Sequence, residues 1–124
     1  AIPGRFRIPI LNWSSANQVM EDYPEIKRWF IAGHSIGGVV ANLLVRQRSD
    51  LSTISGMILL GSFCIDRFSL ANTQLPTLSI HGSRDRMVEK FKRLEKNLPT
   101  PNKMIEIAGA PVSIGFLLAR LLYL

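Results

Sequence analysis

The residues best suited to do chemistry form a G-x-S-x-G pattern with one further glycine, Gly33-His34-Ser35-Ile36-Gly37-Gly38. A serine on a tight turn between a strand and a helix exposes its hydroxyl for nucleophilic attack. Its backbone is strained there and neighbouring chains approach closely, so we expect Gly33 and Gly37 to supply the freedom that the turn needs. The Ile36 amide and the positive end of the following helix would favour a developing oxyanion.

A pattern with only three fixed residues occurs often by chance, so G-x-S-x-G alone is weak evidence for a catalytic serine. The alternative is a glycine-rich turn that carries an unremarkable serine. The context favours the first interpretation, because residues 28–33 predict a short buried strand and the apolar spacing from Ile36 to about Arg48 predicts a helix. We therefore interpret Ser35 as the serine of a nucleophile elbow.

A carboxylate follows at the position that such a serine requires. The run Leu78-Ser79-Ile80-His81-Gly82-Ser83-Arg84-Asp85 predicts a strand that leads into a loop, and Asp85 follows Ser35 by 50 residues. Nucleophile before acid is the chain order of this architecture, and Asp85 would hold a histidine in the correct tautomer. The alternative is a loop aspartate that caps the next helix. Asp66 is a weaker candidate for the acid.

A catalytic histidine is not identified. The chain contains two histidines, His34 beside the serine and His81 near the end of a predicted strand. The His34 side chain should point away from the Ser35 hydroxyl, and His81 is better explained as a structural residue. Without a base serine is a poor nucleophile, because its hydroxyl must lose a proton as it attacks.

Strands and helices alternate along the chain. Predicted strands cover residues 5–11, 28–33, 55–62, 77–81 and 103–108. Between them, helices are predicted from Ser14 or Ser15 to about Tyr23, from Ile36, and from Met87 or Val88 to Leu98. This alternation is typical of an α/β fold, a mostly parallel sheet of about five strands flanked by helices.

With these motifs in place, the sequence resembles the α/β-hydrolase superfamily, and in particular small single-domain serine hydrolases with G-H-S-x-G-G followed by a strand that ends H-G-x-x-D. The resemblance covers most of the chain from about Phe6 to Ala108. It implies Ser35 as nucleophile, the Ile36 amide as part of the oxyanion hole, and Asp85 as the acid. It also aligns residues 104–110 with the last strand of the family, after which the catalytic histidine normally follows.

The chain departs from this family at both ends. Pro111-Val112-Ser113 stands where the family carries its histidine. Related enzymes have about three more strands upstream, including the loop that donates a second oxyanion amide, so the chain looks truncated. We expect residues 1–110 to form an incomplete hydrolase core and residues 111–124 to form an atypical apolar tail.

Three explanations of the tail stay open. It is an aberrant end, such as a frameshifted or alternatively spliced segment; or a short apolar helix that packs on the core; or a segment that binds a partner or a membrane surface. Its leucines at positions 117, 118, 121, 122 and 124 are compatible with each.

Composition narrows the remaining function classes. The net charge is +6, but the basic residues are scattered and interleaved with acids, so no nucleic acid partner is expected. With Cys64 alone and no histidine pair at ligand spacing, neither a metal nor another cofactor is expected. The expected function is acyl or ester hydrolysis of a small-molecule substrate through Ser35, impaired for lack of a histidine. The alternative is a non-catalytic hydrolase remnant that retains the fold for binding.

Overall fold

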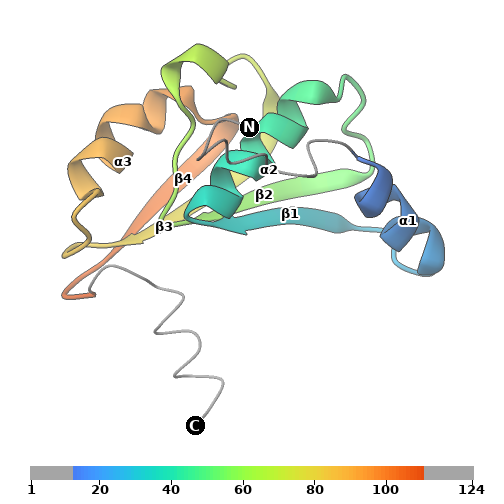
Figure 1. Cartoon of the computed structure of the whole chain (residues 1–124), viewed down its shortest axis with the longest axis horizontal. Coiled ribbons are helices and arrows are strands. Elements are labelled where there is room, and N and C mark those ends of the chain that lie inside the picture. Colours follow the sequence, from blue (N-terminus) through green and yellow to red (C-terminus); the bar gives the residue numbers. More distant parts are fainter. Residues whose placement is uncertain (1–12, 111–124) are drawn as a thin grey trace, which may run out of the picture.

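A computed structural model describes residues 13–110, so the strand predicted at 5–11 and the tail 111–124 lie outside the described residues. Within that range four parallel strands form one sheet in the order β1-β2-β3-β4, and all four arrows point the same way in Figure 1. The strands are β1 (Trp29–His34), β2 (Ile54–Leu60), β3 (Gln74–Gly82) and β4 (Thr100–Ile107).

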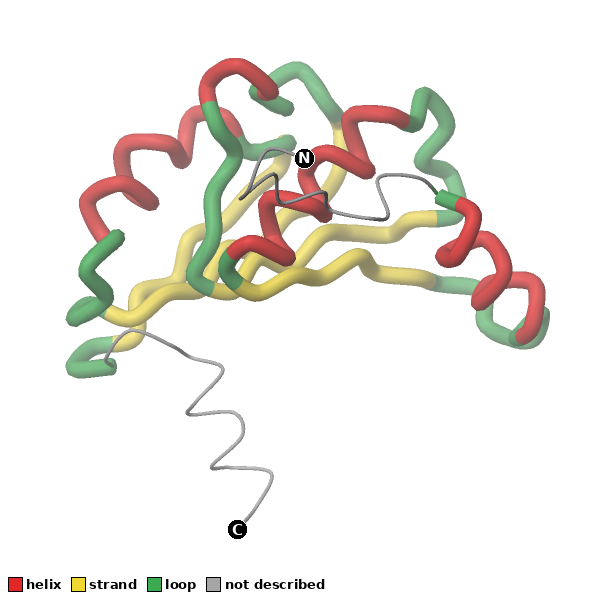
Figure 2. The backbone as a smooth tube through the Cα atoms, viewed as in Figure 1, coloured by secondary structure: helices red, strands yellow, loops and turns green. Residues whose placement is uncertain are grey.

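Helical segments occupy the connections between the described strands, and one more helix precedes β1. The α-helices are α1 (Ser14–Asp22), α2 (Ile36–Gln47) and α3 (Val88–Leu94), and two single turns of 3-10 helix are η1 (Asp66–Phe68) and η2 (Glu95–Asn97). The α/β class inferred from the alternating pattern is confirmed. The described chain forms a parallel sheet whose connecting helices lie against it (Figure 2).

The core lies between α2 and the sheet. Ala41 and Val45 of α2 pack with Met57 and Leu59 of β2 and with Leu75 of β3, each at most 2% exposed. At the far end of the sheet, the Trp13 indole donates a hydrogen bond to the Leu44 carbonyl and ties α1 to α2 (2.9 Å). The apolar spacing along α2 therefore serves to bury one helix face on the strands.

The sheet has two unequal faces. Helices α2 and α3 lie on one side of it in Figure 1, and no described helix covers the other side. We call the uncovered side the open face. Alternation along the paired strands places on it the side chains of Phe30, Ala32, Ile58, Leu60, Leu78, Ile80, Ile105 and Ile107.

Two strands begin earlier than their sequences predict. β3 starts at Gln74 and includes Pro76, although the predicted strand starts after that proline. The register with β4 shifts between Gln74 and Thr77, so the missing N–H of Pro76 lies in the irregular part of the ladder, where proline is tolerated. β4 starts at Thr100 instead of residue 103 and spans Pro101 for the same reason.

Other departures concern exposure and helix ends. β1 was expected to be a buried strand, but its side chains alternate and Phe30 on the open face is 59% exposed. The helix after Asp85 breaks at Leu94 into the η2 turn before it reaches Leu98. α1 begins at Ser14 with Trp13 in the N-cap position, so Trp13 stands where a serine cap was expected.

Candidate functional site

Ser35 occupies a strained turn between β1 and α2. Its backbone has φ 52° and ψ −121°, and it is the one non-glycine residue with positive φ among residues 13–110. Such a conformation costs an L-residue on the order of 1–3 kcal/mol and persists only where neighbours enforce it. The Ser35 amide donates to the Leu60 carbonyl (3.0 Å), and its carbonyl accepts from the Ser62 hydroxyl (2.7 Å) and the Gly38 amide (3.0 Å). The residue itself is exposed.

The glycines around Ser35 have different roles. A Cβ on Gly33 would collide with the backbone of Gly37, and a Cβ on Gly38 would collide with the Ser62 side chain. Gly37 has open space in that direction, and none of these three glycines has a positive φ. The expectation that Gly37 supplies room for the turn is therefore wrong. Gly33 and Gly38 supply it, and Ser35 itself carries the unusual φ.

Ser62 is a supporting residue that the sequence analysis missed. It is buried, and its hydroxyl clamps the Ser35 carbonyl while its Cβ faces Gly38. No motif marks it. Its one signal is that it is the last residue of the strand predicted at 55–62, which in the structure ends earlier, at Leu60.

The Ile36 amide is free to act as a donor. Ile36 is the first residue of α2, where amides have no carbonyl one turn earlier to bond, and within the described chain its N–H makes no hydrogen bond. The amide thus points outward from the positive end of the helix dipole. This is the geometry expected of an oxyanion donor, while the Ile36 side chain is 59% exposed.

Asp85 follows β3 and is 7% exposed. Its Oδ1 accepts a hydrogen bond from the Met87 amide (2.8 Å), so the carboxylate closes a local turn before α3. That is the capping role considered as the alternative from the sequence. The second oxygen, Oδ2, accepts no hydrogen bond from the described residues and lies 3.7 Å from the point where a Cβ on Gly61 would stand. One oxygen therefore fixes the carboxylate and the other remains open to a partner.

The end of β2 connects the serine to the carboxylate. Leu60 bonds the Ser35 amide, Gly61 lies beside Asp85 Oδ2, and Gly61 itself has φ 54°. Since β1 and β3 flank β2, two strand spacings of roughly 4.8 Å each separate the two backbones. The structure places Ser35 and Asp85 on the same edge of the sheet, at the carboxyl ends of the strands, with the end of β2 in the space between their backbones.

Neither histidine bridges this space. His34 is exposed and shares the open face with Leu60, its partner in β2. His81 is 1% exposed on the other face, with its ring 5.3 Å from that of Phe91 and its Nε2 3.5 Å from Glu106 Oε1. Neither forms a hydrogen bond to Ser35 or Asp85. Residues 111–113, where the resemblance places the family's histidine, lie outside the described residues.

Asp66 and Cys64, the other two residues considered from the sequence, are held by local contacts or by burial. Asp66 is exposed, and the Asn97 amide (2.9 Å), followed by the nearby Lys96 and Arg93 charges, lowers the pKa of its carboxyl. Burial raises the pKa of the Cys64 thiol from 9.0 to about 12. Over residues 13–110 no three His, Cys, Asp or Glu side chains are grouped to hold a metal ion. None of the described helices is long and apolar enough to span a bilayer.

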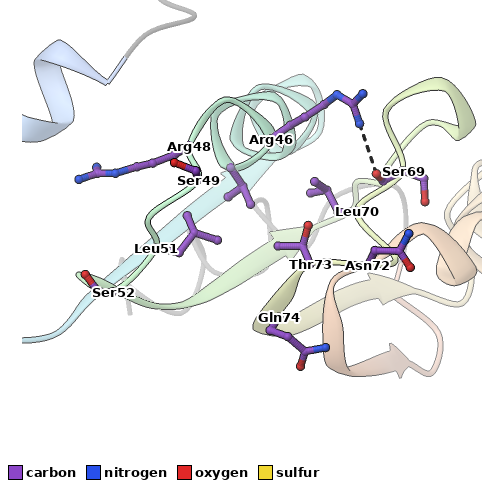
Figure 3. Close-up of a pocket in the computed structure, with 11 residues that line it drawn as sticks. Arg46, Arg48, Ser49, Leu51, Ser52, Ser69, Leu70, Asn72, Thr73 and Gln74 are labelled. Carbon is purple, nitrogen blue, oxygen red and sulfur yellow. Dashed lines mark hydrogen bonds between the residues drawn. The ribbon is translucent and has the colours of Figure 1, made fainter.

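A pocket of about 880 Å³ lies at the opposite edge of the sheet from Ser35, where α2 ends and β2 and β3 begin. In Figure 3 the Arg46 side chain reaches to the Ser69 carbonyl (3.5 Å), and Arg48 extends in the other direction. The Arg48 guanidinium stacks over the Trp13 ring at 4.5 Å. Both cations offset the negative end of the α2 dipole. The pocket contains neither Ser35 nor Asp85, so it is separate from the candidate site.

The sequence was compared with models of known protein families. The model of the Alpha/beta hydrolase family matches residues 4–114. The chain belongs to the alpha/beta hydrolase family. No curated protein matches this member of the family at a significant level.

Solved structures share the hydrolase fold at low sequence identity. An alpha-beta serine hydrolase homologue from Coxiella burnetii has a TM-score of 0.64 and 18% identity, with 86% of this chain and 51% of that chain covered. A predicted CIB-like hydrolase from Thermoplasma acidophilum has a TM-score of 0.58 and 17% identity, with 86% of this chain and 56% of that chain covered. An alpha/beta hydrolase enzyme from a sediment metagenome of the Mar Chica lagoon, Morocco, has a TM-score of 0.55 and 16% identity, with 88% of this chain and 65% of that chain covered. This chain thus spans between half and two thirds of their length.

Alanine substitutions at two glycines of the elbow should have opposite effects. Gly33→Ala forces a Cβ against the Gly37 backbone, and we expect a loss of about 3 kcal/mol or more in the free energy of unfolding. Gly37→Ala meets open space within α2 and should be neutral or stabilising by up to about 1 kcal/mol. Urea unfolding of both variants measures the difference. Equal effects would contradict the close approach at Gly33.

Cys64 should be unreactive in the folded chain. Because burial raises its pKa to about 12, little thiolate forms at pH 8, and an aromatic disulfide reagent should label it only after urea is added. The folded state also retains the proton to a higher pH than the unfolded state. Its contribution to the free energy of unfolding is therefore complete below pH 9 and lost as the pH rises toward 12. Rapid labelling without urea would disprove this.

Proposed function

We propose that this chain hydrolyses carboxylic esters or related acyl compounds, with Ser35 as the nucleophile. The observation that supports this most directly is the turn at Ser35. An exposed serine is held at φ 52° at the start of a helix by hydrogen bonds with Leu60 and Ser62 of a neighbouring segment and with Gly38 of the helix itself. Strain of this kind is retained at functional sites more than elsewhere. Membership of a hydrolase family supports the reaction class.

In the proposed reaction, Ser35 Oγ forms a bond to the substrate carbonyl carbon and gives its proton to a solvent water molecule or an added base, and the carbonyl oxygen becomes an oxyanion. The free Ile36 amide is placed to stabilise that charge. The alcohol then leaves with a proton, and water attacks the acyl-enzyme and releases the acid. Asp85, with Oδ2 unbonded, would orient the base and stabilise its charged form.

The base is the missing component. Neither histidine of the chain forms a hydrogen bond to Ser35 or Asp85 in the described structure. In serine proteases the loss of a member of the triad reduces turnover by about 10⁴ to 10⁶. We therefore propose slow acylation of Ser35 by activated esters and very slow turnover in the isolated chain.

The same observation favours a second candidate, a non-catalytic hydrolase remnant that keeps the fold for binding. The two candidates differ in one property, the nucleophilicity of Ser35. A remnant would leave Ser35 no more reactive than any other exposed serine.

Ser35→Ala tests this difference. We expect the chain to incorporate a fluorophosphonate on one serine and to release nitrophenol from a nitrophenyl ester in a burst, and both signals should disappear in Ser35→Ala. Ser49→Ala is the matched control, because Ser49 is an exposed serine at the opposite edge of the sheet. Intact-protein mass spectrometry locates the label. Equal labelling of the chain and of Ser35→Ala would rule out the enzyme and support the remnant.

Added imidazole should replace the missing base. Imidazole also hydrolyses activated esters by itself, so the quantity to measure is the acceleration over the Ser35→Ala protein. We expect a saturable acceleration that falls roughly tenfold or more in Asp85→Asn. Asparagine retains an oxygen for the Met87 amide and removes only the charge. Undiminished acceleration in Asp85→Asn would exclude Asp85 as the acid partner.

A further inference from the structure

The pocket of Figure 3 lies between two loops at the edge of the sheet opposite Ser35. The first loop, residues 48–52, leads from α2 to β2, and the second, residues 69–73, leads from η1 to β3. The pocket volume of about 880 Å³ falls within the roughly 300–1,000 Å³ of small-molecule sites. Since neither Ser35 nor Asp85 lines it, a ligand bound there would be separate from the proposed reaction.

The floor of this pocket belongs to the hydrophobic core. Val45 and Leu70 line the pocket but are only 1% and 3% exposed, and Leu51 packs against the same core cluster. Close packing of this kind leaves the floor little freedom to collapse. Because these side chains expose so little surface, a ligand would touch mainly the polar groups around them.

Both loops are fixed by hydrogen bonds. In the first loop the Ser52 amide donates to the Asp50 carboxylate (2.9 Å). In the second the Thr73 carbonyl accepts from the Thr100 amide at the start of β4 (3.0 Å). The walls of the pocket are therefore formed before a ligand arrives, which reduces the entropic cost of binding.

The second loop presents polar groups without partners among the described residues. The Asn72 side-chain amide and the Thr73 hydroxyl make no hydrogen bond within residues 13–110. Gln74 donates from its side-chain amide to the Thr100 hydroxyl (3.2 Å), which leaves its carbonyl oxygen free. Hydroxyl and amide groups both donate and accept, so this wall suits a ligand with several hydroxyl groups.

One guanidinium reaches across the pocket. Arg46 extends from the last turn of α2 to the Ser69 carbonyl of the second loop (3.5 Å), as the dashed line in Figure 3 shows. This long contact uses one of the five N–H donors of the guanidinium, and the planar arrangement of the others suits a carboxylate or a phosphate. Among the described residues that line the pocket, none is acidic.

The charge at this edge of the sheet favours an anion. Arg46 and Arg48 both line the pocket, whereas Asp50 lies in the first loop without lining it. The C-terminal end of α2 adds about half a negative charge. Two full positive charges exceed the Asp50 charge and this partial charge together, so the balance is positive.

We propose that this pocket binds a small hydroxylated anion, a sugar phosphate or a sugar acid. The acidic group of the ligand binds the Arg46 guanidinium, and its hydroxyl groups bind Asn72, Thr73 and the Gln74 carbonyl oxygen. The inference is independent of the proposed hydrolysis, because the two sites share no residue.

NMR titration of the isotope-labelled full chain with glucose 6-phosphate and with gluconate tests the proposal. At least one of these sugar anions should shift the amide signals of both loops at millimolar concentration, and the one that binds identifies the acidic group. The Ser35 and Ile36 signals should not move. Glucose lacks the charge and inorganic phosphate lacks the carbon-bound hydroxyls, so each should bind at least about tenfold more weakly.

Three results of the titration would overturn the proposal. They are no shift with either sugar anion, binding of glucose or inorganic phosphate as tight as that of the sugar anions, and shifts confined to the signals around Ser35.

Arg46→Gln and Arg67→Gln form a matched pair of variants. Both guanidiniums lie over the Phe68 ring at 5.4 Å and both residues are exposed, but of the two only Arg46 lines the pocket. Loss of a charge-assisted hydrogen bond should weaken binding of the sugar anion at least about tenfold in Arg46→Gln. Arg67→Gln removes the same charge nearby and should change the affinity less than about twofold. Equal losses would indicate unspecific attraction and would overturn the site.

Thr73→Val tests the hydroxyl contact. Valine keeps the shape of the side chain and the backbone bond to Thr100, so the free energy of unfolding should change little while binding of the sugar anion weakens severalfold. Binding of inorganic phosphate should not change in this variant. Undiminished affinity for the sugar anion in Thr73→Val would contradict the proposed recognition of its hydroxyl groups.

Discussion

Three hydrogen bonds at Ser35 hold the site together. The Leu60 carbonyl, the Ser62 hydroxyl and the Gly38 amide bind the backbone of a residue whose φ of 52° is unfavourable for any side chain. Two of these partners come from the end of β2. The strain at Ser35 is therefore maintained by the pairing of β1 with β2, and the exposure of its hydroxyl depends on that pairing.

The same end of β2 also lies beside the Asp85 carboxylate. Gly61 follows the Leu60 carbonyl and lies beside the Asp85 carboxylate, so one short segment sets the positions of both groups. The Asp85 carboxylate is fixed by the Met87 amide whether or not a base is present. The two side chains proposed as nucleophile and acid are thus held by contacts that involve neither histidine.

Much of this arrangement could be predicted from the sequence. The glycines and the serine at fixed spacing placed the turn, although the close approach of the backbone requires glycine at positions 33 and 38 and not at 37. Strand ends were predicted less well, since pairing with the neighbouring strand and not local propensity decides whether Pro76 belongs to β3. The clamp from Ser62 joins residues far apart in sequence, and no local pattern reveals it. The open face was also unpredictable, because the continuous apolar run of β2 looks the same whether one face is covered or two.

The order of the strands has a consequence for how the chain folds. Each strand pairs with the next one along the chain, as Ile58 with Leu78 and Leu78 with Lys103, so every pairing closes a loop of similar, moderate length. Loop closure costs grow with the logarithm of loop length, so no single pairing presents a dominant entropic barrier. Each new strand can add to an edge that already exists, and the sheet can assemble stepwise in the direction of synthesis on the ribosome.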